Sequence, residues 1–388
     1  MFLTADRIHN GLGWLPHGTV IEVADDGTVV SIVDAPVEDA VFYDGVLVPG
    51  FVNAHCHLEL SHMNGVVAEH TGLIPFLKNI PQHRNDFTDE QKKTARHAGY
   101  RELITNGVVA IGDISNTADT ADIRSMGGLH FHTFVEALGF NEANAPGNFG
   151  YAQNVFSQLS NQENGGNILR QSIVPHAPYS VSSRLFKLID AHEPGALISI
   201  HNQESTDEDL YYKTKGGRVP ELLSLFGIDD TQFTPSGKSS LQTYLEWMSE
   251  DRPYMFVHNT CSKREDVQFA HSRLKSAFWC LCPNANLYIE NNLPDIHMLM
   301  DERTNICIGT DSLSSNHQLS IIAELFSIKT HFPEIGWDVL FQWATSNGAN
   351  ALQMQHAVGT ITPGKKPGII QVQGIELSAV MPSVNRIV

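Results

Sequence analysis

Two histidines separated by one residue, His55 and His57, are the pair whose type and spacing most directly suggest chemistry. They follow the turn signal Pro49-Gly50 and a short apolar run. Side chains of an extended strand alternate between its two faces, so both imidazoles point the same way and Cys56 points the other way. Two imidazoles on one face suit a divalent metal such as zinc. The motif alone is equally compatible with two structural histidines.

Polar residues also end several later apolar stretches. His176, His201 and His258 each end such a stretch, and Asp311 ends the last one. Glu204 follows His201 by three residues. One histidine at a strand end is usually a hydrogen-bonded structural residue. Histidines at four of eight predicted strand ends, with an aspartate at a fifth, instead favour a shared metal site at one edge of the fold.

This set of strand-end residues could activate water at a metal. Three nitrogens and one oxygen are available as ligands, from His55, His57, His201 and Asp311. A divalent metal lowers the pKa of its bound water, and Asp311 could take the released proton. Glu204 is placed to shuttle protons between water, substrate nitrogen and leaving group, and His258 to stabilise charge at the attacked carbon. Further acidic residues follow Glu204, so a solvated loop acid is the alternative for that residue.

The elements that must position these residues are apolar strands alternating with helical segments. The predicted strands cover residues 48–57, 108–113, 129–137, 168–176, 197–201, 254–258, 277–282 and 305–311. Eight nearly continuous apolar strands with helices between them predict a parallel sheet covered by helices. At this length the best fit is an α/β fold, a (β/α)8 TIM barrel. An open doubly wound sheet is the alternative, although no Gly-x-Gly-x-x-Gly follows an early strand.

Helix signals and turn residues delimit the remaining segments. Helices are predicted over 89–105, where Thr88 and Gln91 suit a capping box, and over 183–192 and 320–332. Residues 19–23 and 27–33 read as a β-hairpin, and short β-rich stretches follow the turn-rich segment 359–368. We therefore predict that residues 1–48 and 355–388 form one discontinuous small β domain, and that residues 49–354 form the barrel.

Composition excludes several kinds of partner. The 388 residues include 25 Lys and Arg against 43 Asp and Glu, a formal net charge of −18 with no basic cluster. This charge argues against nucleic-acid polymers and anionic membranes as partners. No secretory signal or membrane-spanning apolar run is visible. Five cysteines without a Cys-x-x-Cys motif favour reduced thiols, and hence a cytoplasmic protein.

Six sequence motifs, in order along nearly the whole chain, resemble the amidohydrolase superfamily. They are Pro-Gly-Phe-Val-Asn-Ala-His-Cys-His from Pro49, Pro-His-Ala-Pro-Tyr-Ser from Pro175, His201-x-x-Glu204, His258-Asn259-Thr260, Cys-Pro-Asn-Ala-Asn from Cys282, and Gly-Thr-Asp-Ser from Gly309. Together they are similar to the branch that contains nucleobase and nucleoside deaminases and the chlorohydrolase-like triazine hydrolases. His-Leu-Glu-Leu-Ser from His57 further resembles aminofutalosine deaminase-like members, which hints at an adenine-type substrate.

The resemblance implies a barrel beside a β-sandwich built from both termini, and particular roles for residues. It implies one metal held by His55, His57, His201 and Asp311, with Glu204 and His258 as acid–base partners. It also implies three substrate contacts. These are His176, Asn286 in the loop after the seventh strand, and Glu59 in the pocket. The alternatives are that His176 orients a water beside the ligands and that Glu59 caps a loop. Two-metal relatives carry a carboxylated lysine at the end of strand four, and residues 168–178 contain no lysine, which favours one metal.

The resulting expectation is a metal-dependent aminohydrolase of an adenine-like or other N-heterocyclic small molecule, releasing ammonia. Hydrolysis of a cyclic amide or of a halogen on a similar ring uses the same activated water and is the alternative. A non-catalytic binding barrel is the second alternative, and the intact set of predicted ligands argues against it. Three imidazoles and a carboxylate suit Zn²⁺, with Fe²⁺ or Mn²⁺ also compatible. Relatives often form homodimers, so a homodimer is possible.

Overall fold

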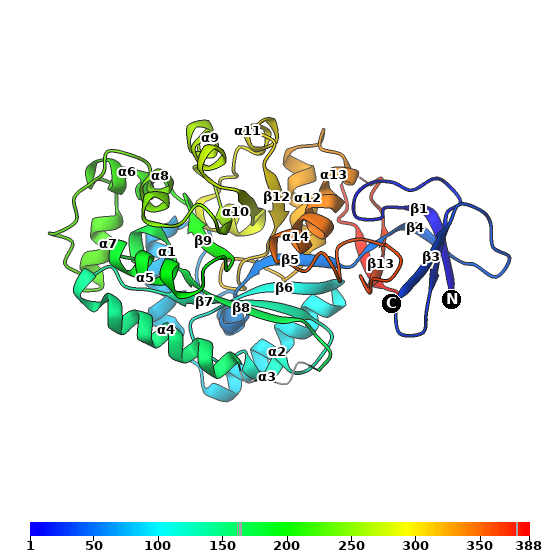
Figure 1. The fold of residues 1–388 in the computed structure, drawn as a ribbon, viewed down its shortest axis with the longest axis horizontal. Helices are drawn as coiled ribbons and strands as arrows, with labels where there is room; N and C mark the ends of the chain where they lie inside the picture. Colours follow the sequence, from blue (N-terminus) through cyan, green and yellow to red (C-terminus); the bar gives the residue numbers. More distant parts are fainter. Residues whose placement is uncertain (161, 163–164, 378) are drawn as a thin grey trace.

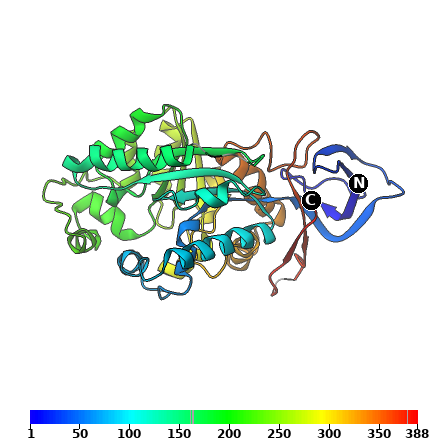
Figure 2. The same cartoon turned by 90° about the horizontal axis from the view of Figure 1, so that it is seen from below.

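The computed structural model describes residues 1–160, 162, 165–377 and 379–388. Figure 1 shows an α/β body with central strands and surrounding helices, and a smaller β element at one end that holds both chain termini. Figure 2, from below, shows the same separation into a body and a terminal β element.

The strands of the body form two parallel four-stranded sheets. The first has the order β5 (Phe51–Cys56), β6 (Val108–Ser115), β7 (His130–Ala137), β8 (Leu169–Pro175). The second has the order β12 (Asn305–Ile308), β11 (Ser276–Leu281), β10 (Pro253–His258), β9 (Ile198–Asn202). The predicted α/β architecture with parallel strands is confirmed.

The two sheets meet at both edges near the predicted site. Cys56 forms an isolated parallel bridge with Asp311, and the backbone N–H groups of Thr310 and Asp311 donate to the carbonyl of His55 at 3.0 and 3.1 Å. At the other edge, the N–H of His201 donates to the carbonyl of His176 at 3.0 Å. Among the described residues, continuous strand pairing runs only within each sheet, so the closed barrel stays a prediction.

Helices connect and cover these strands. They are α1 (Leu73–His83), α2 (Asp89–Thr105), α3 (Ala121–Arg124), α4 (Ala145–Ser160), α5 (Ser183–His192), α6 (Thr206–Thr214), α7 (Val219–Leu225), α8 (Ser240–Tyr244), α9 (Arg264–Arg273), α10 (Pro283–Glu290), α11 (Ile296–Asp301), α12 (Ile321–His331), α13 (Trp337–Gln342) and α14 (Gly348–Ala351). The helices predicted over 89–105 and 183–192 are confirmed, because α2 and α5 have the same bounds. The capping box of Thr88 and Gln91 is present.

One predicted strand, 48–57, is wrong because the structure divides it at Gly50. β4 (Val41–Pro49) ends before Gly50, and β5 begins after it. The Gly50 N–H donates to the carbonyls of Pro367 and Gly368, at 3.2 and 3.0 Å. A Cβ at Gly50 would lie 2.3 Å from Cγ1 of Val109. The chain therefore passes from the terminal sheet into the body at a point where only glycine fits.

The terminal β element is one six-stranded sheet of mixed direction. Its order is β14 (Ser383–Arg386), β13 (Ile369–Gln373), β4, β1 (Phe2–Ile8), β2 (Val20–Val23), β3 (Val29–Val33). β2 and β3 pair antiparallel, which confirms the predicted hairpin. β13 pairs with β4, so the two ends of the chain build one sheet. The described residues place these strands in a single sheet, and the predicted sandwich is not confirmed.

The apolar interior has three parts. The largest cluster fills the space between the strands of the body and their helices. A second cluster lies around α1, α6 and α7, and a third lies within the terminal sheet. Within the described ranges, every helix is too short or too polar to cross a bilayer.

Candidate metal centre and active site

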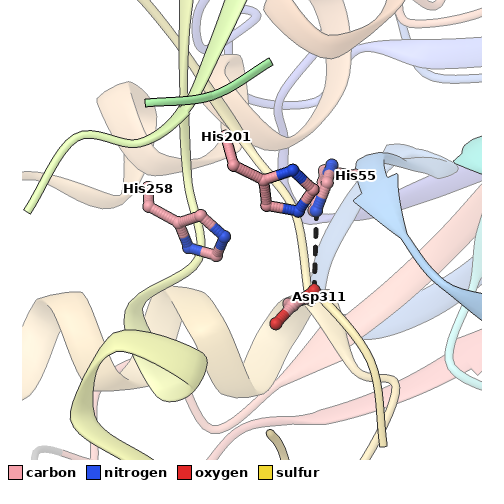
Figure 3. Close-up of side chains that lie close together, drawn as sticks. All are labelled: His55, His201, His258 and Asp311. Carbon is pink, nitrogen blue, oxygen red and sulfur yellow. Dashed lines mark ion pairs between the residues drawn. The ribbon is translucent and has the colours of Figure 1, made fainter. Parts of the chain in front are cut away.

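Four donor atoms converge where the two parallel sheets meet. Nε2 of His57 lies 3.2 Å from Nε2 of His55, 3.3 Å from Nε2 of His201 and 3.2 Å from Oδ1 of Asp311. Nε2 of His55 is 3.5 Å from the same Asp311 oxygen (Figure 3). Donors about 2.0–2.1 Å from a tetrahedral zinc ion lie about 3.3 Å apart. The spacing of these donors therefore fits one metal ion among them.

The ends of three strands position these donors. His55 belongs to β5 and His57 follows it, whereas His201 belongs to β9 and Asp311 follows β12. Asp311 has a φ of 57° and His258 has a φ of 73°, in the left-handed region that non-glycine residues rarely adopt. Such backbone conformations concentrate at functional sites, where surrounding contacts hold them.

The tautomer of His201 is set by its surroundings. Its Nδ1–H donates to the backbone carbonyl of His176 at 2.9 Å, since a carbonyl can only accept. Nε2 therefore presents a lone pair toward His57 and Asp311, the form that binds metal. The carboxylate of Asp311 is oriented in turn by the hydroxyl of Ser315, which donates to Oδ2.

Burial keeps the three imidazoles neutral. It lowers the pKa of His55 to about 4, of His57 to about 3 and of His201 to about 4. Burial alone would raise the pKa of Asp311, but its hydrogen bond with His55 and the nearby imidazoles hold that pKa below its ordinary value. Neutral imidazoles and an ionised carboxylate are the protonation states that metal ligands require.

Two overlapping donor groups also lie in this region. One group consists of His55, His201, His258 and Asp311, so it contains His258 in place of His57. Its ligand atoms all lie within 4.8 Å of one another (Figure 3). Glu136, His176 and His201 form a second such group. The histidines after β8 and in β9 and β10 are therefore close enough to share one ion or to surround it.

Glu204 and His258 form a buried acid–base pair beside the donors. Oε1 of Glu204 lies 3.7 Å from Nε2 of His258. Burial raises the pKa of Glu204 well above its ordinary value, and the charges of Asp311 and Glu208 add to this shift. Burial lowers the pKa of His258. A carboxyl whose pKa is raised and an imidazole whose pKa is lowered can donate and accept protons in the cavity.

A cavity of about 410 Å³ opens onto these groups, within the size range of small-molecule sites. Six of the residues singled out from the sequence line it: His57, His176, His201, Glu204, His258 and Asp311. His55 is fully buried and does not line it. His176 contacts the cavity while its Nδ1 lies 2.7 Å from the hydroxyl of Ser180.

Two predicted substrate contacts lie elsewhere. Asn286 is buried outside the cavity lining, and its side-chain amide donates to the hydroxyl of Thr260. Glu59 is also outside the lining, and its Oε2 accepts from the backbone N–H groups of Asn116 and Thr117 at 3.0 and 3.2 Å. These bonds match the loop-capping alternative for Glu59, because the loop after β6, which is distant in the sequence, holds its side chain.

Three charged or amide side chains of the cavity escaped the sequence analysis. Glu136 is the last but one residue of β7, Asn116 follows β6, and Arg84 follows α1. Nδ2 of Asn116 donates to Oε2 of Glu136 at 2.7 Å. Burial raises the pKa of Glu136 to about 8. The rule that found the histidines, polar residues at strand ends, would have found Glu136 and Asn116. No local pattern marks Arg84.

Comparison with known proteins gives a consistent result. The sequence model of the amidohydrolase family matches residues 46–385. The aminodeoxyfutalosine deaminase of a Nitratiruptor species is 28% identical over 309 residues, which cover 79% of this chain and 73% of that protein.

Two solved structures have a similar fold. The crystal structure of Helicobacter pylori aminofutalosine deaminase in complex with methylthio-coformycin superposes with a TM-score of 0.77 at 21% identity, covering 95% of this chain and 91% of that one. A Xanthomonas campestris adenosine deaminase with bound zinc gives a TM-score of 0.75 at 18% identity, covering 97% and 86%.

Proposed function

Because this chain belongs to the amidohydrolase family and is a hydrolytic enzyme of C–N bonds, we propose that it deaminates an adenine-like or other N-heterocyclic small molecule. Water is consumed and ammonia is released. The convergence of four donor atoms with the Glu204–His258 pair at one cavity is the observation that carries the proposal. The deaminase names of its relatives support this choice of reaction.

His55, His57, His201 and Asp311 would hold one divalent ion. Their mutual spacing supports this set over the one containing His258, which we assign to acid–base chemistry. Nitrogen and carboxylate ligands suit Zn²⁺, and a zinc-containing neighbour of similar fold supports that choice. When bound, the ion supplies Lewis acidity, which makes a water molecule nucleophilic near neutral pH.

The residues around the cavity divide the proton transfers between them. Asp311 takes a proton from the attacking water. Glu204, whose pKa is raised by burial, delivers a proton to the ring nitrogen beside the attacked carbon. Its carboxylate then carries the proton held by Asp311 to the departing amine and regains a proton from the hydroxyl of the adduct as the carbonyl forms. Neutral His258 lies 3.7 Å from Glu204 and faces the charge that develops at the attacked carbon. His176, on the cavity wall, orients the substrate ring.

The wider predictions on architecture and location belong to the same proposal. We propose that the two parallel sheets act as one (β/α)8 barrel over residues 49–354, with residues 1–48 and 355–388 as a second domain. The pairing of β13 with β4 supports the shared terminal domain. All five cysteines are free, which is consistent with the proposed cytoplasmic location. A homodimer stays a prediction.

Ammonia release by zinc-loaded protein tests the proposal, with adenosine, guanine, cytosine and an aminotriazine as substrates. Glu204→Gln should retain zinc and lose about 10²- to 10⁴-fold in kcat, because a proton donor is removed. Glu221→Gln, an exposed carboxylate on α7, is the matched control and should keep full activity. Undiminished activity in Glu204→Gln would remove that residue from the mechanism. Zinc-loaded protein that releases no ammonia, yet hydrolyses a cyclic amide or a halogenated ring, would reassign the reaction.

A further inference from the structure

Two loops hold the proposed acid–base pair in place. The loop after β9, residues 203–205, contains Glu204, and β9 pairs with β10. The loop after β10, residues 259–263, directly follows His258. The backbone is left-handed at both strand ends, with a φ of 45° at Gln203 and 73° at His258. Non-glycine residues persist in this conformation only where surrounding contacts hold them, so the contacts of these loops bear on the geometry of the pair.

The side chain of Gln203 is fully buried, lies outside the described cavity lining and has four hydrogen-bond partners. Its Nε2 lies 2.8 Å from Oδ2 of Asp266 and 3.3 Å from Oδ1 of Asp209. Carboxylate oxygens accept, so the two N–H groups of the amide donate to them. Its Oε1 accepts from the hydroxyl of Ser262 at 2.7 Å and from Nδ2 of Asn202 at 3.5 Å. Partners on every side leave this buried amide one preferred position.

Gln203 joins the two loops through its backbone as well as its side chain. Its carbonyl accepts from the N–H of Cys261 at 2.8 Å, and Cys261 and Ser262 both belong to the loop after β10. Its own N–H donates to Oε1 of Glu208 on α6 at 3.0 Å. The loop after β9 is therefore fixed to the loop after β10 on one side and to α6 on the other.

The acid–base pair is sensitive to small movements of either loop. Oε1 of Glu204 lies 3.7 Å from Nε2 of His258, just beyond the length of a hydrogen bond. A misplacement of about 1 Å at a reacting group can cost about 100-fold in rate. Because Gln203 lies outside the described cavity lining, it can act on the reaction only through the placement of other residues.

We propose that Gln203 is a positioning residue, whose buried amide fixes the loop after β9 against the loop after β10 and so sets the separation of Glu204 and His258. The kinetic consequence of this inference rests on the proposed deaminase function. Its structural consequence can be measured without a substrate.

Gln203→Met keeps the approximate size of the side chain and removes its hydrogen-bonding groups. Asp209 keeps Lys213 as a partner at 3.1 Å. Asp266 keeps the hydroxyl of Ser239 at 2.5 Å, so neither carboxylate is left without a partner and the variant should fold. With the best substrate among adenosine, guanine, cytosine and an aminotriazine, kcat for ammonia release should fall about 10- to 100-fold. KM and zinc content should stay at their wild-type values, because the side-chain partners of Gln203 are neither lining residues nor metal donors.

Gln242→Met is the matched control. Nε2 of Gln242, on α8, donates to the other oxygen of Asp266, Oδ1, at 3.0 Å. The variant therefore removes an amide hydrogen bond from the same carboxylate, and this bond involves neither of the two loops. Tm should fall in both methionine variants, whereas kcat should fall only in Gln203→Met. This difference separates a positioning role from a purely structural one.

Ser262→Ala tests the connection between the loops from its other end. It removes the hydroxyl that reaches Gln203 from the loop after β10 and leaves the two carboxylates with their donors. Its kcat should fall by less than that of Gln203→Met. Adding Ser262→Ala to Gln203→Met should lower kcat no further, because the bond that the two residues share is already lost. Additive losses would show that the two residues act independently and would overturn the proposal.

Crystal structures of the zinc-loaded wild type, Gln203→Met and Gln242→Met give a readout that needs no substrate. The separation of Oε1 of Glu204 and Nε2 of His258 should change by about 0.5 Å or more in Gln203→Met only, since catalytic groups must be held within about that tolerance.

The remaining outcomes separate this inference from the proposed function. An unchanged separation, equal losses of kcat in Gln203→Met and Gln242→Met, an effect confined to KM, or loss of zinc would overturn the positioning role and leave deamination standing. Zinc-loaded wild type that releases no ammonia from any of the four compounds would overturn the proposed function instead, and the separation in the crystal structures would then decide the role of Gln203.

Discussion

The carboxylate of Glu136 lies against His201 on the side of the ring away from the other donors, with Oε1 3.4 Å from Nδ1. The same Nδ1 donates to the carbonyl of His176 at 2.9 Å, and Asn116 fixes the other oxygen of Glu136 at 2.7 Å. Residues from β7 and β8 therefore orient a donor that belongs to β9. Partners of this kind tune the affinity of a histidine for metal.

Glu136→Ala should weaken zinc binding about 10- to 100-fold, because His201 loses one of the groups that orient its ring. Glu136→Gln should weaken it less. With a pKa raised by burial to about 8, the native carboxyl is largely protonated at neutral pH and resembles an amide in shape and charge. Competition with a chelator of known affinity measures both constants. An alanine variant with the wild-type constant would show that His176 alone orients His201.

His57→Ala should reduce bound zinc well below about one ion per chain, since a tetrahedral site loses one of its ligands. Cys56→Ala is the matched control, because Cys56 is the buried neighbour of His57 and is not one of the four donors. It should retain full zinc content. Elemental analysis of the purified variants after dialysis gives the stoichiometry. Full zinc in His57→Ala would favour the alternative donor set with His258.

Folding stability should decrease as pH rises, because of buried carboxyl groups such as Glu208. Burial raises the pKa of Glu208 from 4.5 to about 8, although Ser240 and the N–H of Gln203 donate to it. The folded state thus holds a proton that the unfolded chain releases. The resulting stabilisation is complete below the unfolded pKa and is lost as pH rises through the folded pKa.

Thermal unfolding from about pH 5 to 8.5 checks this dependence. Glu208→Gln cannot ionise and should show a smaller decrease in Tm across that range. Glu221→Gln, at an exposed position, should follow the wild-type slope. If Glu208→Gln keeps the wild-type slope, Glu208 does not carry a proton in the folded protein at neutral pH.

Gly309→Ala should destabilise the protein by about 1–3 kcal/mol, because an added methyl group overpacks the junction of the two sheets. A Cβ there would lie 2.8 Å from both Cβ and the carbonyl oxygen of His55. Zinc affinity should fall as well, since His55 must move. Gly147→Ala in α4 meets no atom within 4 Å and should be neutral or stabilising by about 0.5–1 kcal/mol. Denaturant unfolding of both variants separates these outcomes.

Local sequence determined the elements that depend on neighbouring residues. The N-terminal bound of α2 follows from Thr88 and Gln91, whose capping box forms between neighbouring residues at the start of the helix. The parallel strands follow from nearly continuous apolar runs. Strand ends of a parallel sheet share one edge, so the convergence of His55, His57, His201 and Asp311 could be anticipated as well.

Tertiary packing decided which side chains actually reach the cavity. Glu59 lies two residues after His57 but turns away to bind the loop after β6, and Asn286 is held by Thr260. Glu136 enters the cavity although it is part of a buried apolar strand. In each case the position depends on partners that are distant in the sequence.

The apolar part of the cavity lining has the same origin. Phe76 of α1 and Leu222 of α7 are far apart in the chain, and nothing in either segment alone assigns them to a common cavity. The sequence thus determined the type of reaction, because the residues that carry it lie at strand ends. The position of those residues follows from the direction of the strands. The shape of the substrate pocket was decided only in the folded chain, because it arises from long-range packing of helices whose own sequences specify an apolar face but not its partner.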